Sequence, residues 1–521
     1  MQAPSFVTER PISMAPDGTK YPIPTEFESQ TSFDTVKNTA EWYRNQGRKI
    51  VVVQGLGFVG AAVAAVISDA KDASGQPLYF VIGVDLPSPA GYWKVGKIND
   101  GLTPIVSPDV ELDRLIDTNV HHTKNLCATT TEQAYSLADF IVVDVPLDVH
   151  NRLAETAAEV DINLDAFKAA IRTVGRNMQP EALVLIETTV PAGATQLVAQ
   201  PILQEERAKR GINAPLLLAH AYERVMPGPR YVDSIRKFWR TFSGIDEASA
   251  AKAHQFLSSF IDTAAYPLWD LEDTNGSELA KLMENSYRAM NIAFIHEWTL
   301  LAEKAGINLF AVIDSIRVRK GTHDNIRLPG FGVGGYCLTK DSLLAQWSAT
   351  HLFDSDVVLQ MTMDALKINY TMPLHSLDLL NELTDDGLAG KTIVVCGVSY
   401  LPEVADTRNS PTELLVDELT KVGATVIVHD PYAITWPERP DIEVEQDLEA
   451  CLRQADGLVF AIPHLAYREL STQTLLDHTP VPPIIVDAQN IISDEKASAL
   501  HEAGCRILGV GKGHWRKRGY Q

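Results

Sequence analysis

The stretch Lys49-Ile-Val-Val-Val-Gln-Gly55-Leu-Gly57-Phe-Val-Gly60 decides the fold of this chain. An apolar run of strand type leads into three glycines spaced G-x-G-x-x-G, and an alanine- and valine-rich helical pattern follows. In such a unit the first glycine makes a tight turn, the second lets the backbone approach a pyrophosphate, and the third lets the helix pack on the strand. The sequence therefore predicts a dinucleotide at the N-terminus of this helix. The residues expected to contact it are Gly55, Gly57, Phe58, Val59 and Gly60.

A second strand-like run, Tyr79-Phe-Val-Ile-Gly-Val-Asp85, ends in an acid. An acid at this position hydrogen-bonds the ribose 2′-hydroxyl and favours NAD over NADP. The polar residues 71–77 resemble a loop insertion, which explains the long separation between the glycines and the acid. Three glycines alone are weak evidence, but strand, glycines, helix, strand and terminal acid in this order indicate an NAD site with Asp85 at the ribose.

A chain of 521 residues is too long for one hydrophobic core, and its length predicts roughly two to four domains. Apolar runs alternate with helical patterns in two separate parts, which predicts a parallel sheet in each. The predicted fold class is α/β, with two Rossmann-like doubly wound domains joined by an all-helical middle domain. The predicted segments are an N-terminal arm outside the catalytic core (1–47), which ends in a short helical pattern (33–48), an NAD-binding domain (48–232), the helical middle domain (233–387) and the second Rossmann-like domain (388–521).

The composition of the chain argues against several kinds of partner and binding site. The net charge of −22 argues against nucleic acid and anionic membrane as partners. The five cysteines are scattered without a C-x-x-C pair, which fits a reducing cytoplasm. No apolar run reaches membrane-spanning length, the N-terminus lacks a signal-peptide core, and no histidine or cysteine spacing predicts a metal site. The sequence therefore predicts a cytoplasmic protein that acts on a small molecule.

One cysteine stands at the end of the glycine-rich stretch Gly330-Phe-Gly-Val-Gly-Gly-Tyr-Cys337-Leu-Thr-Lys340-Asp341. If a helix begins at Cys337, then Cys337 and Asp341 share one of its faces. The helix N-terminus and the ammonium of Lys340 would both lower the pKa of the thiol, so Cys337 is a candidate nucleophile. The glycines would let the backbone approach a bulky ligand and hold its phosphates. The other four cysteines are expected to fill the core.

Two further positions carry candidate residues. The apolar run that ends at Glu187 is followed by a loop containing Thr189. Ligands of doubly wound sheets bind outside the carboxyl ends of the strands, so Thr189 is expected at the cofactor. A helical pattern further on carries Lys281 and Asn285 four residues apart, and hence on one face.

Taken in order, these motifs resemble the UDP-glucose/GDP-mannose dehydrogenase family. The resemblance covers roughly residues 48–515, and no single motif decides it. The matching segments are Gly55–Gly60, Glu187–Gly193, Glu223–Gly228, Glu278–Asn285, Gly332–Asp341, Asp406–Pro411 and Asp430–Tyr432.

The resemblance implies a reaction in which the primary alcohol of a nucleotide sugar is oxidised twice by NAD to a carboxylate, for polysaccharide or glycan precursors. Cys337 would trap the aldehyde as a thiohemiacetal, which becomes a thioester that water cleaves. Lys281 would stabilise the oxyanion, and Asn285 would donate a hydrogen bond. Asp341 would act as base or orient water and the cysteine, and Glu187 is the other candidate for handling water.

The resemblance also implies binding residues and a substrate class. Arg408 would reach the cofactor from the third domain. The substrate would be UDP-linked, with the UDP-N-acetylhexosamine branch suspected. The residues expected to bind it are Arg224, Gly332, Gly334, Gly335 and Tyr400.

The departures from the family pattern include Leu147, Tyr222, Leu401 and Gln489, and Tyr336, where the family often has histidine or serine. The core catalytic set survives, so these departures predict an altered sugar or nucleotide specificity. Two alternatives remain open. One is a single-step 3-hydroxyacid dehydrogenase, which also places lysine and asparagine on a helix after a Rossmann domain. The other is a non-catalytic nucleotide-sugar sensor or assembly subunit.

The segment Met290–Ala302 is rich in apolar residues. A long helix there has more apolar surface than one small domain covers, and a two-fold axis would bury it against a second copy. The resemblance implies dimerisation through the same region. We therefore predict at least a homodimer, with an interface centred on residues 278–315, to which the N-terminal arm could add contacts.

Overall fold

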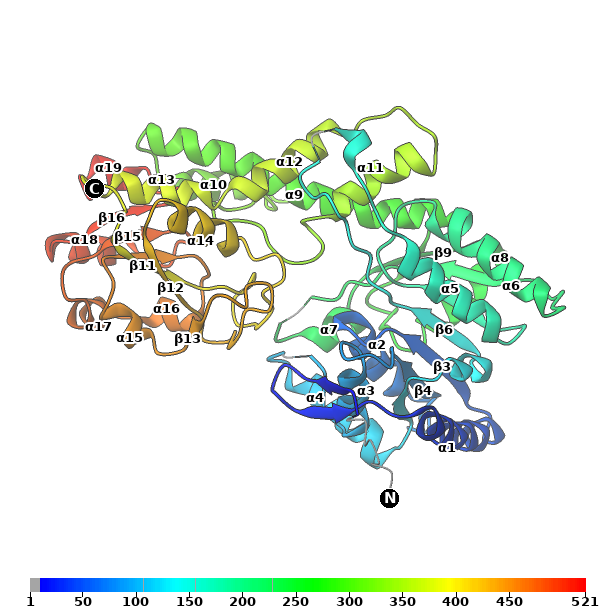
Figure 1. Ribbon diagram of the computed structural model, residues 1–521. Helices are drawn as coiled ribbons and strands as arrows, with labels where there is room; N and C mark the ends of the chain where they lie inside the picture. Colours follow the sequence, from blue (N-terminus) through cyan, green and yellow to red (C-terminus); the bar gives the residue numbers. More distant parts are fainter. Residues whose placement is uncertain (1–9, 106, 155, 227) are drawn as a thin grey trace, which may run out of the picture. The chain divides into compact units, whose positions relative to one another are not determined.

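The computed structural model describes residues 10–105, 107–154, 156–226 and 228–521. Within these ranges the strands form a hairpin, an eight-stranded sheet and a six-stranded sheet (Figure 1). The chain divides into two compact units. The first takes in the chain up to His150 together with residues 161–282 and 347–356, and the second takes in residues 151–160, 283–346 and 357–521. No helix among the described residues is both long and apolar enough to cross a membrane.

The eight-stranded sheet of the first unit has the strand order β10-β9-β8-β7-β6-β3-β4-β5. Its strands are β3 (Lys49–Gln54), β4 (Tyr79–Val84), β5 (Leu126–Thr129), β6 (Phe140–Val143), β7 (Leu183–Ile186), β8 (Leu217–His220), β9 (Arg240–Gly244) and β10 (Leu268–Asp270). Neighbouring strands run parallel except β8 and β9. The strand order reverses between β3 and β6, so the crevice outside their carboxyl ends is where a ligand of this fold binds.

Helices cover this sheet, and the strands are apolar because both faces are buried. The helices are α2 (Phe58–Ser68), α3 (Tyr92–Asn99), α4 (Val110–Asp117), α5 (Asp165–Asn177), α6 (Gln200–Lys209), α7 (Tyr231–Arg236) and α8 (Glu247–Leu257), with short η1 (Thr118–His122), η2 (Glu132–Leu137) and η4 (Ala194–Ala199). The short η3 (Ala157–Glu159) belongs to the second unit. Strands β9 and β10 extend the sheet beyond residue 232, so the boundary predicted there falls inside this sheet. Short, partly polar strands such as Arg240-Thr-Phe-Ser-Gly244 lack the apolar run that marks the others.

The N-terminal arm folds onto the first unit. It forms the antiparallel hairpin of β1 (Ile12–Met14) and β2 (Lys20–Pro22), followed by α1 (Glu26–Asn45). The ring of Tyr43 on α1 stacks on Phe80 of β4, with 5.1 Å between ring centroids. Between β5 and β6 the chain crosses with only the short 3-10 helix η2, and α1 packs beside it against β3, β4 and β5. The arm therefore completes one face of the sheet.

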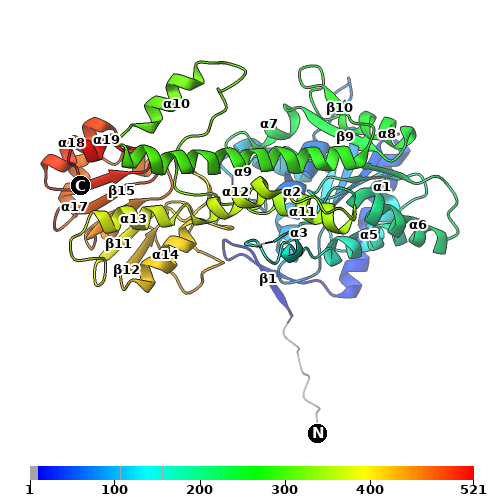
Figure 2. The ribbon, with the colours of Figure 1, turned by 90° about the horizontal axis from the view of Figure 1, so that it is seen from above.

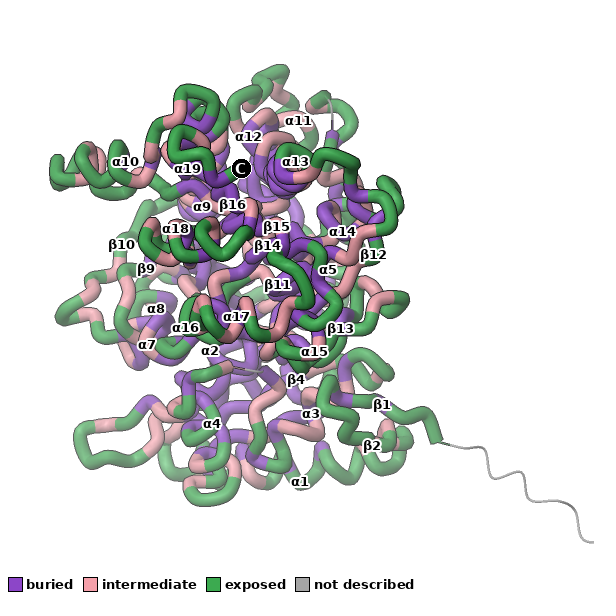
Figure 3. Tube along the Cα trace, turned by 90° about the vertical axis from the view of Figure 1, so that its left-hand side faces the viewer, coloured by how far each residue is buried: buried purple, intermediate pink, exposed green. Residues whose placement is uncertain are grey.

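The second unit joins helices to the six-stranded sheet. Its helices are the C-terminal part of α9 (Thr274–Lys304), then α10 (Leu309–Arg317), the N-terminal part of α11 (Asp341–His351), α12 (Gln360–Thr371) and α13 (Leu374–Glu382). Figure 2 shows α9 as one continuous helix of 31 residues. In Figure 3 the trace of α10 is largely green and pink, because only Leu309 and Ile313 among its side chains are buried.

The six-stranded sheet is wholly parallel, in the order β13-β12-β11-β14-β15-β16. Its strands are β11 (Thr392–Cys396), β12 (Thr425–His429), β13 (Val444–Glu445), β14 (Gly457–Phe460), β15 (Ile484–Asp487) and β16 (Arg506–Gly509). Its helices are α14 (Thr412–Lys421), α15 (Leu448–Leu452), α16 (Leu465–Glu469), α17 (Thr472–His478), α18 (Asp494–Glu502) and α19 (His514–Lys517). The predicted fold class, two Rossmann-like sheets with a helical segment between them in the chain, is confirmed.

Candidate active site

The glycine loop after β3 is shaped for a dinucleotide. Gly55 has φ +91°, and a Cβ there would lie 2.3 Å from the Asp144 carbonyl oxygen. A Cβ on Gly60 would lie 1.9 Å from the Gly55 carbonyl oxygen. Gly57 caps the N-terminus of α2, and its side-chain position is open. A side chain would therefore not fit at the first and third glycines. There is free space at the second, where a pyrophosphate would meet the helix N-terminus.

Asp85 lies directly after β4, beside this loop. Its carboxylate accepts hydrogen bonds from the Leu56 N–H (3.0 Å) and the Leu86 N–H (2.8 Å) and pairs with the ammonium of Lys94 (3.0 Å). A carboxylate at the end of this strand is the group that hydrogen-bonds the ribose 2′-hydroxyl. The residues present therefore fit NAD, with the phosphates at the glycine loop and the adenosine ribose at Asp85.

Lys281, on α9, contacts an acid that sequence reasoning left out of the catalytic set. Its ammonium donates to the Glu223 carbonyl oxygen (3.0 Å) and to Glu223 Oε1 (3.1 Å), and both side chains are nearly buried. The ammonium also lies 5.4 Å from the centroid of the Tyr222 ring. Glu223 stands in the sequence motif 223–228, but only Arg224 of that motif was predicted to be a site residue. The Arg224 guanidinium lies over the rings of Tyr222 and Phe238.

Glu187, predicted to handle water, is held by a different cation. Arg240 Nη1 donates to Glu187 Oε1 at 2.6 Å, and the two side chains are 2% and 1% exposed. Burial raises the pKa of Glu187 against the opposing effect of Arg240. Burial, then the charges of Glu187 and Glu223, raise the pKa of Asp144 well above its ordinary value. Glu187 is thus part of a buried ion pair, whereas Glu223 is the carboxylate beside Lys281. Thr189, which was predicted to lie at the cofactor, is half-buried in the loop after β7.

Glu278 fixes the start of α9 to that same loop. Its carboxylate accepts hydrogen bonds from the Gly193 N–H (2.6 Å), the Thr195 N–H (2.8 Å) and the Thr195 hydroxyl (2.6 Å). Burial raises its pKa to about 8, while these bonds lower it. Glu278 stands one turn before Lys281, so this anchor sets the position of the lysine.

Replacing Glu278 with alanine should lower the free energy of unfolding by about 3 kcal/mol, because two buried N–H groups lose their acceptor. Urea unfolding of the full chain measures this. Replacing the exposed Glu247 on α8 serves as the control, and equal unfolding midpoints for the two variants would contradict the anchor.

Cys337 lies in the second unit, four residues ahead of α11. The helix begins at Asp341 and not at Cys337, because residues 338–340 form a turn. The Cys337 carbonyl oxygen nevertheless accepts from the Lys340 N–H (3.1 Å) and the Asp341 N–H (2.9 Å). Cys337 and Asp341 are therefore joined by a backbone hydrogen bond of the i, i+4 type. The cysteine side chain is half-buried.

Asp341 is the centre of a buried cluster. Its Oδ2 accepts from Asn285 Nδ2 at 2.7 Å, and its Oδ1 pairs with the Lys340 ammonium at 3.1 Å. The side chains of Asp341 and Lys340 are at most 1% exposed. The structure thus brings Asn285 to Asp341, as a donor that fixes the carboxylate. No three His, Cys, Asp or Glu side chains in the described ranges gather to hold a metal ion.

Residues of the third predicted domain hold the glycine-rich loop. A Cβ on Gly335 (φ +83°) would lie 2.6 Å from the Tyr400 ring, and one on Gly334 would lie 2.7 Å from Tyr400 Cβ, so glycine is required for this packing. Gly332 packs in the same way against Pro411. The predicted Tyr400 therefore supports the loop directly.

Two cations approach the face of Tyr336, the residue before the cysteine. The Lys340 ammonium lies 4.4 Å and the Arg408 guanidinium 5.6 Å from the ring centroid. Arg408 also makes a two-bond pair with Asp406, at 2.8 and 2.6 Å. Arg408, predicted at the cofactor, is thus oriented by Asp406 and Tyr336.

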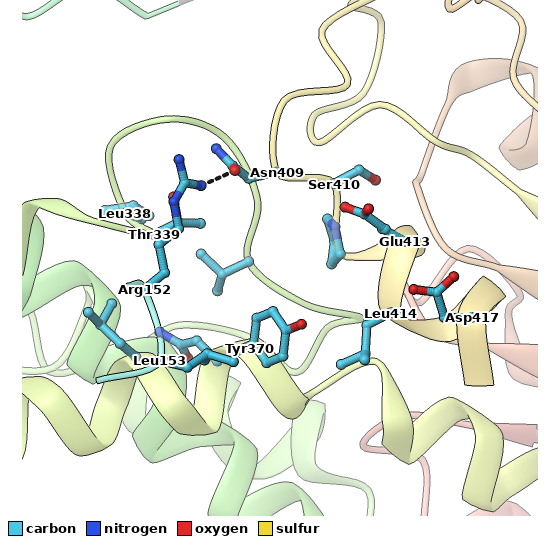
Figure 4. A pocket seen from close by; sticks show the side chains of 14 residues that line it. Arg152, Leu153, Leu338, Thr339, Tyr370, Asn409, Ser410, Glu413, Leu414 and Asp417 are labelled. Carbon is cyan, nitrogen blue, oxygen red and sulfur yellow. Dashed lines mark hydrogen bonds between the residues drawn. The ribbon is translucent and has the colours of Figure 1, made fainter. Parts of the chain in front are cut away.

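Asn409, with φ +51°, ties the loop to a second segment. Its amide donates to the Gly335 carbonyl oxygen (3.0 Å), and its Oδ1 accepts from Arg152, as Figure 4 shows. Beside them lies a cavity of about 210 Å³. Its other labelled lining residues in Figure 4 are Leu153, Leu338, Thr339, Tyr370, Ser410, Glu413, Leu414 and Asp417.

Comparison with known families gives three matches in chain order. Residues 48–257 match the NAD binding domain of the UDP-glucose/GDP-mannose dehydrogenase family. Residues 275–371 match its central domain, and residues 394–494 match its UDP binding domain. Together the matches reach both sheets and the helical segment between them.

Individual proteins agree with this result. A UDP-N-acetyl-D-mannosamine dehydrogenase of Pyrococcus horikoshii is 29% identical over 472 residues, which are 89% of this chain and 99% of that protein. The crystal structure of an NDP-N-acetyl-D-galactosaminuronic acid dehydrogenase from Methanosarcina mazei Go1 superposes with a TM-score of 0.74 at 28% identity, covering 91% of this chain and 98% of that one. A UDP-D-ManNAc dehydrogenase structure from Pyrococcus horikoshii gives 0.74 at 27% identity, covering 89% and 100%.

Proposed function

The chain belongs to the UDP-glucose/GDP-mannose dehydrogenase family and is an NAD-dependent nucleotide-sugar dehydrogenase, and within that family we propose that it oxidises the C6 alcohol of UDP-N-acetylmannosamine to the uronic acid. The observation that carries the chemistry is the buried hydrogen bond from Asn285 to Asp341, which lies four residues after Cys337. The relatives named above support the N-acetylhexosamine, and the UDP binding domain supports the nucleotide. The three-part match favours this reaction over a single-step 3-hydroxyacid oxidation. We place the protein in the cytoplasm, where its five free cysteines stay reduced.

The glycine loop and Asp85 would hold NAD, which would supply the hydride acceptor for each of two oxidations. In the proposed sequence, the first oxidation turns the C6 alcohol into an aldehyde and releases a proton. The Cys337 thiolate adds to the aldehyde carbon and forms a thiohemiacetal, whose oxidation leaves a thioester. Water then adds to the thioester carbon, the C–S bond breaks, and the carboxylate and the thiol are released.

The described contacts support a division of roles among the other residues. Lys281 carries the positive charge that stabilises the oxyanion at C6. Glu223, hydrogen-bonded to that lysine, is the carboxylate that we propose for handling water, because Glu187 is bound by Arg240. Asp341 accepts from Asn285 and lies next to Lys340, which fixes its orientation towards the cysteine turn.

A panel of nucleotide sugars tests the proposal. UDP-N-acetylmannosamine should be oxidised with two NADH formed per sugar, ahead of UDP-glucose, UDP-N-acetylglucosamine, UDP-galactose and GDP-mannose. One NADH per substrate, with turnover that survives loss of Cys337, would instead identify the 3-hydroxyacid type. Tight binding of a UDP-sugar without NADH formation would identify a non-catalytic sensor.

We further propose that two copies associate through α9. Apart from Leu300, its exposed apolar side chains form one stripe at three-, four- and seven-residue spacing. They are Leu279, Met283, Tyr287, Phe294, Trp298 and Leu301. Phe294 and Trp298 are each about half exposed, at 51% and 49%. A stripe of this length on a soluble chain is the kind of surface that a two-fold axis buries.

Replacing Phe294 with glutamate should dissociate the dimer, because a charge in the middle of an apolar interface is not solvated. Sedimentation at micromolar concentration would then show the 57.2 kDa monomer in place of a species of twice that mass. The control is Val481→Glu, which changes an equally exposed apolar residue on a loop. A wild-type chain that sediments as a monomer would refute the dimer.

A further inference from the structure

The hairpin β1–β2 of the N-terminal arm contacts the chain that leads out of the ribose site. We infer that this hairpin is a working part of the NAD site and sets the affinity for the adenosine half of the cofactor. The arm precedes residue 48, where the match to the family's NAD binding domain begins. Every contact in the inference lies within the first compact unit.

Ser13 makes the central contact. Its side chain is fully buried, although its neighbours in β1 are exposed. Its hydroxyl donates to the Pro89 carbonyl oxygen (2.7 Å) and accepts from the Trp93 N–H (2.8 Å). The hydroxyl therefore bridges the loop after Asp85 and the first turn of α3, and it satisfies a donor that the helix leaves open at its N-terminus.

The bridged loop encloses Asp85. A Cβ on Gly91 would lie 2.9 Å from Asp85 Oδ1 and 2.6 Å from the Leu86 carbonyl oxygen, so the loop folds back against the carboxylate. Lys94, which pairs with Asp85, directly follows Trp93. Any shift of the Ser13 bridge is therefore transmitted to Asp85, which would meet the ribose, and to its partner Lys94.

The rest of the hairpin is fitted to α3. The Tyr21 ring lies against Gly96, where a Cβ would be 2.2 Å from Tyr21 Cδ1, so α3 has room for the ring only because residue 96 is glycine. The Tyr21 hydroxyl donates to Asp100 Oδ2 at 3.0 Å, and Asp17 pairs with Lys97. These contacts fix the hairpin along the outer face of the helix.

The arm also reaches the strand next to the ribose acid. Thr129 ends β5, and its carbonyl oxygen accepts from the Asp85 N–H at 3.3 Å. A cavity of about 390 Å³ separates this strand end from the arm, lined by Arg10, Pro24 and Ser32 on one side and Asn99 and Thr129 on the other. Pyrophosphate at β3 and ribose at β4 place the adenosine end of the ligand towards β5, on the side that the arm closes.

Binding of ADP-ribose, which keeps the adenosine and the pyrophosphate of NAD but lacks the nicotinamide, tests the inference by isothermal titration calorimetry. Ser13→Ala should raise the Kd for ADP-ribose and for NAD by about 3- to 10-fold, as expected when hydrogen bonds worth about 1 kcal/mol are lost. The Kd for the UDP-sugar should stay within about twofold, since Ser13 is a positioning residue for the cofactor alone. Hydrogen exchange of the amides of residues 88–97 should accelerate in the same variant.

Met14→Ser is the matched control, because Met14 is the exposed neighbour of Ser13 in the same strand. A chain shortened to begin at Pro24 should bind ADP-ribose more weakly still. If that chain does not fold, Ser13→Ala combined with Tyr21→Phe takes its place. Unchanged ADP-ribose binding in Ser13→Ala, or an equal loss of ADP-ribose and UDP-sugar binding, would show that the hairpin only stabilises the fold and would overturn the inference.

Discussion

Replacing Cys337 with alanine is expected to reduce formation of the uronic acid by more than about 10³-fold, the scale seen when a covalent nucleophile is removed. Without the thiol, the aldehyde has no route to a thioester, so the second oxidation stops. The fold should persist, because Cys337 is half-buried in a turn whose hydrogen bonds come from its backbone carbonyl. Binding of NAD and of the UDP-sugar should therefore stay close to that of the unmodified protein.

Mass spectrometry of the products and counting of NADH measure this effect. Cys337→Ser separates nucleophilicity from size and should be almost as inactive, because an alcohol is a much weaker nucleophile than a thiolate. Cys127→Ala, at a half-buried cysteine on β5, should keep normal turnover. Acid formation at the normal rate in Cys337→Ala would rule out the covalent route.

Replacing Lys281 with methionine should lower kcat by about 10²- to 10³-fold, the range for loss of one oxyanion-stabilising group. The same change leaves the nearly buried Glu223 carboxylate without its ammonium partner, which costs about 3–5 kcal/mol of folding free energy for a broken buried pair. Activity and stability should therefore fall together in this variant.

A double variant separates these two effects. Lys281→Met with Glu223→Gln removes both charges, so its urea midpoint should recover towards that of the unmodified chain while kcat stays low. Lys281→Arg keeps the charge and should retain more stability than activity. If the double variant regained kcat along with stability, Lys281 would be a structural residue only.

Local spacing predicted the parts of the site that neighbouring residues build. The glycine loop and the Cys337–Asp341 relation each follow from residues a few positions apart, and Asp85 follows from its place at the end of an apolar strand-like run. The partners of Lys281 and Glu187 could not be predicted in this way, because Glu223 lies 58 residues from Lys281 and Arg240 lies 53 residues from Glu187. The spacing of residues along the sequence does not predict contacts between side chains on different strands and helices.

The fold shows the same limit at its edges. The long apolar strands β3 and β4 were evident from the sequence, whereas β9 and β10 were assigned to the helical region because they are short and partly polar. The helical pattern predicted for residues 33–48 is α1, which begins earlier, at Glu26, where Thr25 and Glu28 form a capping box. Its packing against η2 depends on a short crossover that only the three-dimensional structure reveals.

Tyr336 has a consequence for protein engineering. It departs from the histidine or serine that the family resemblance leads one to expect, yet its ring accommodates two cations on its face, Lys340 and Arg408. Changing a residue to the one most common among relatives usually stabilises a protein. Here the substitution would leave two cations without the ring that they share. A designer who transfers sequence between these enzymes therefore has to exchange positions 336, 340 and 408 as one block.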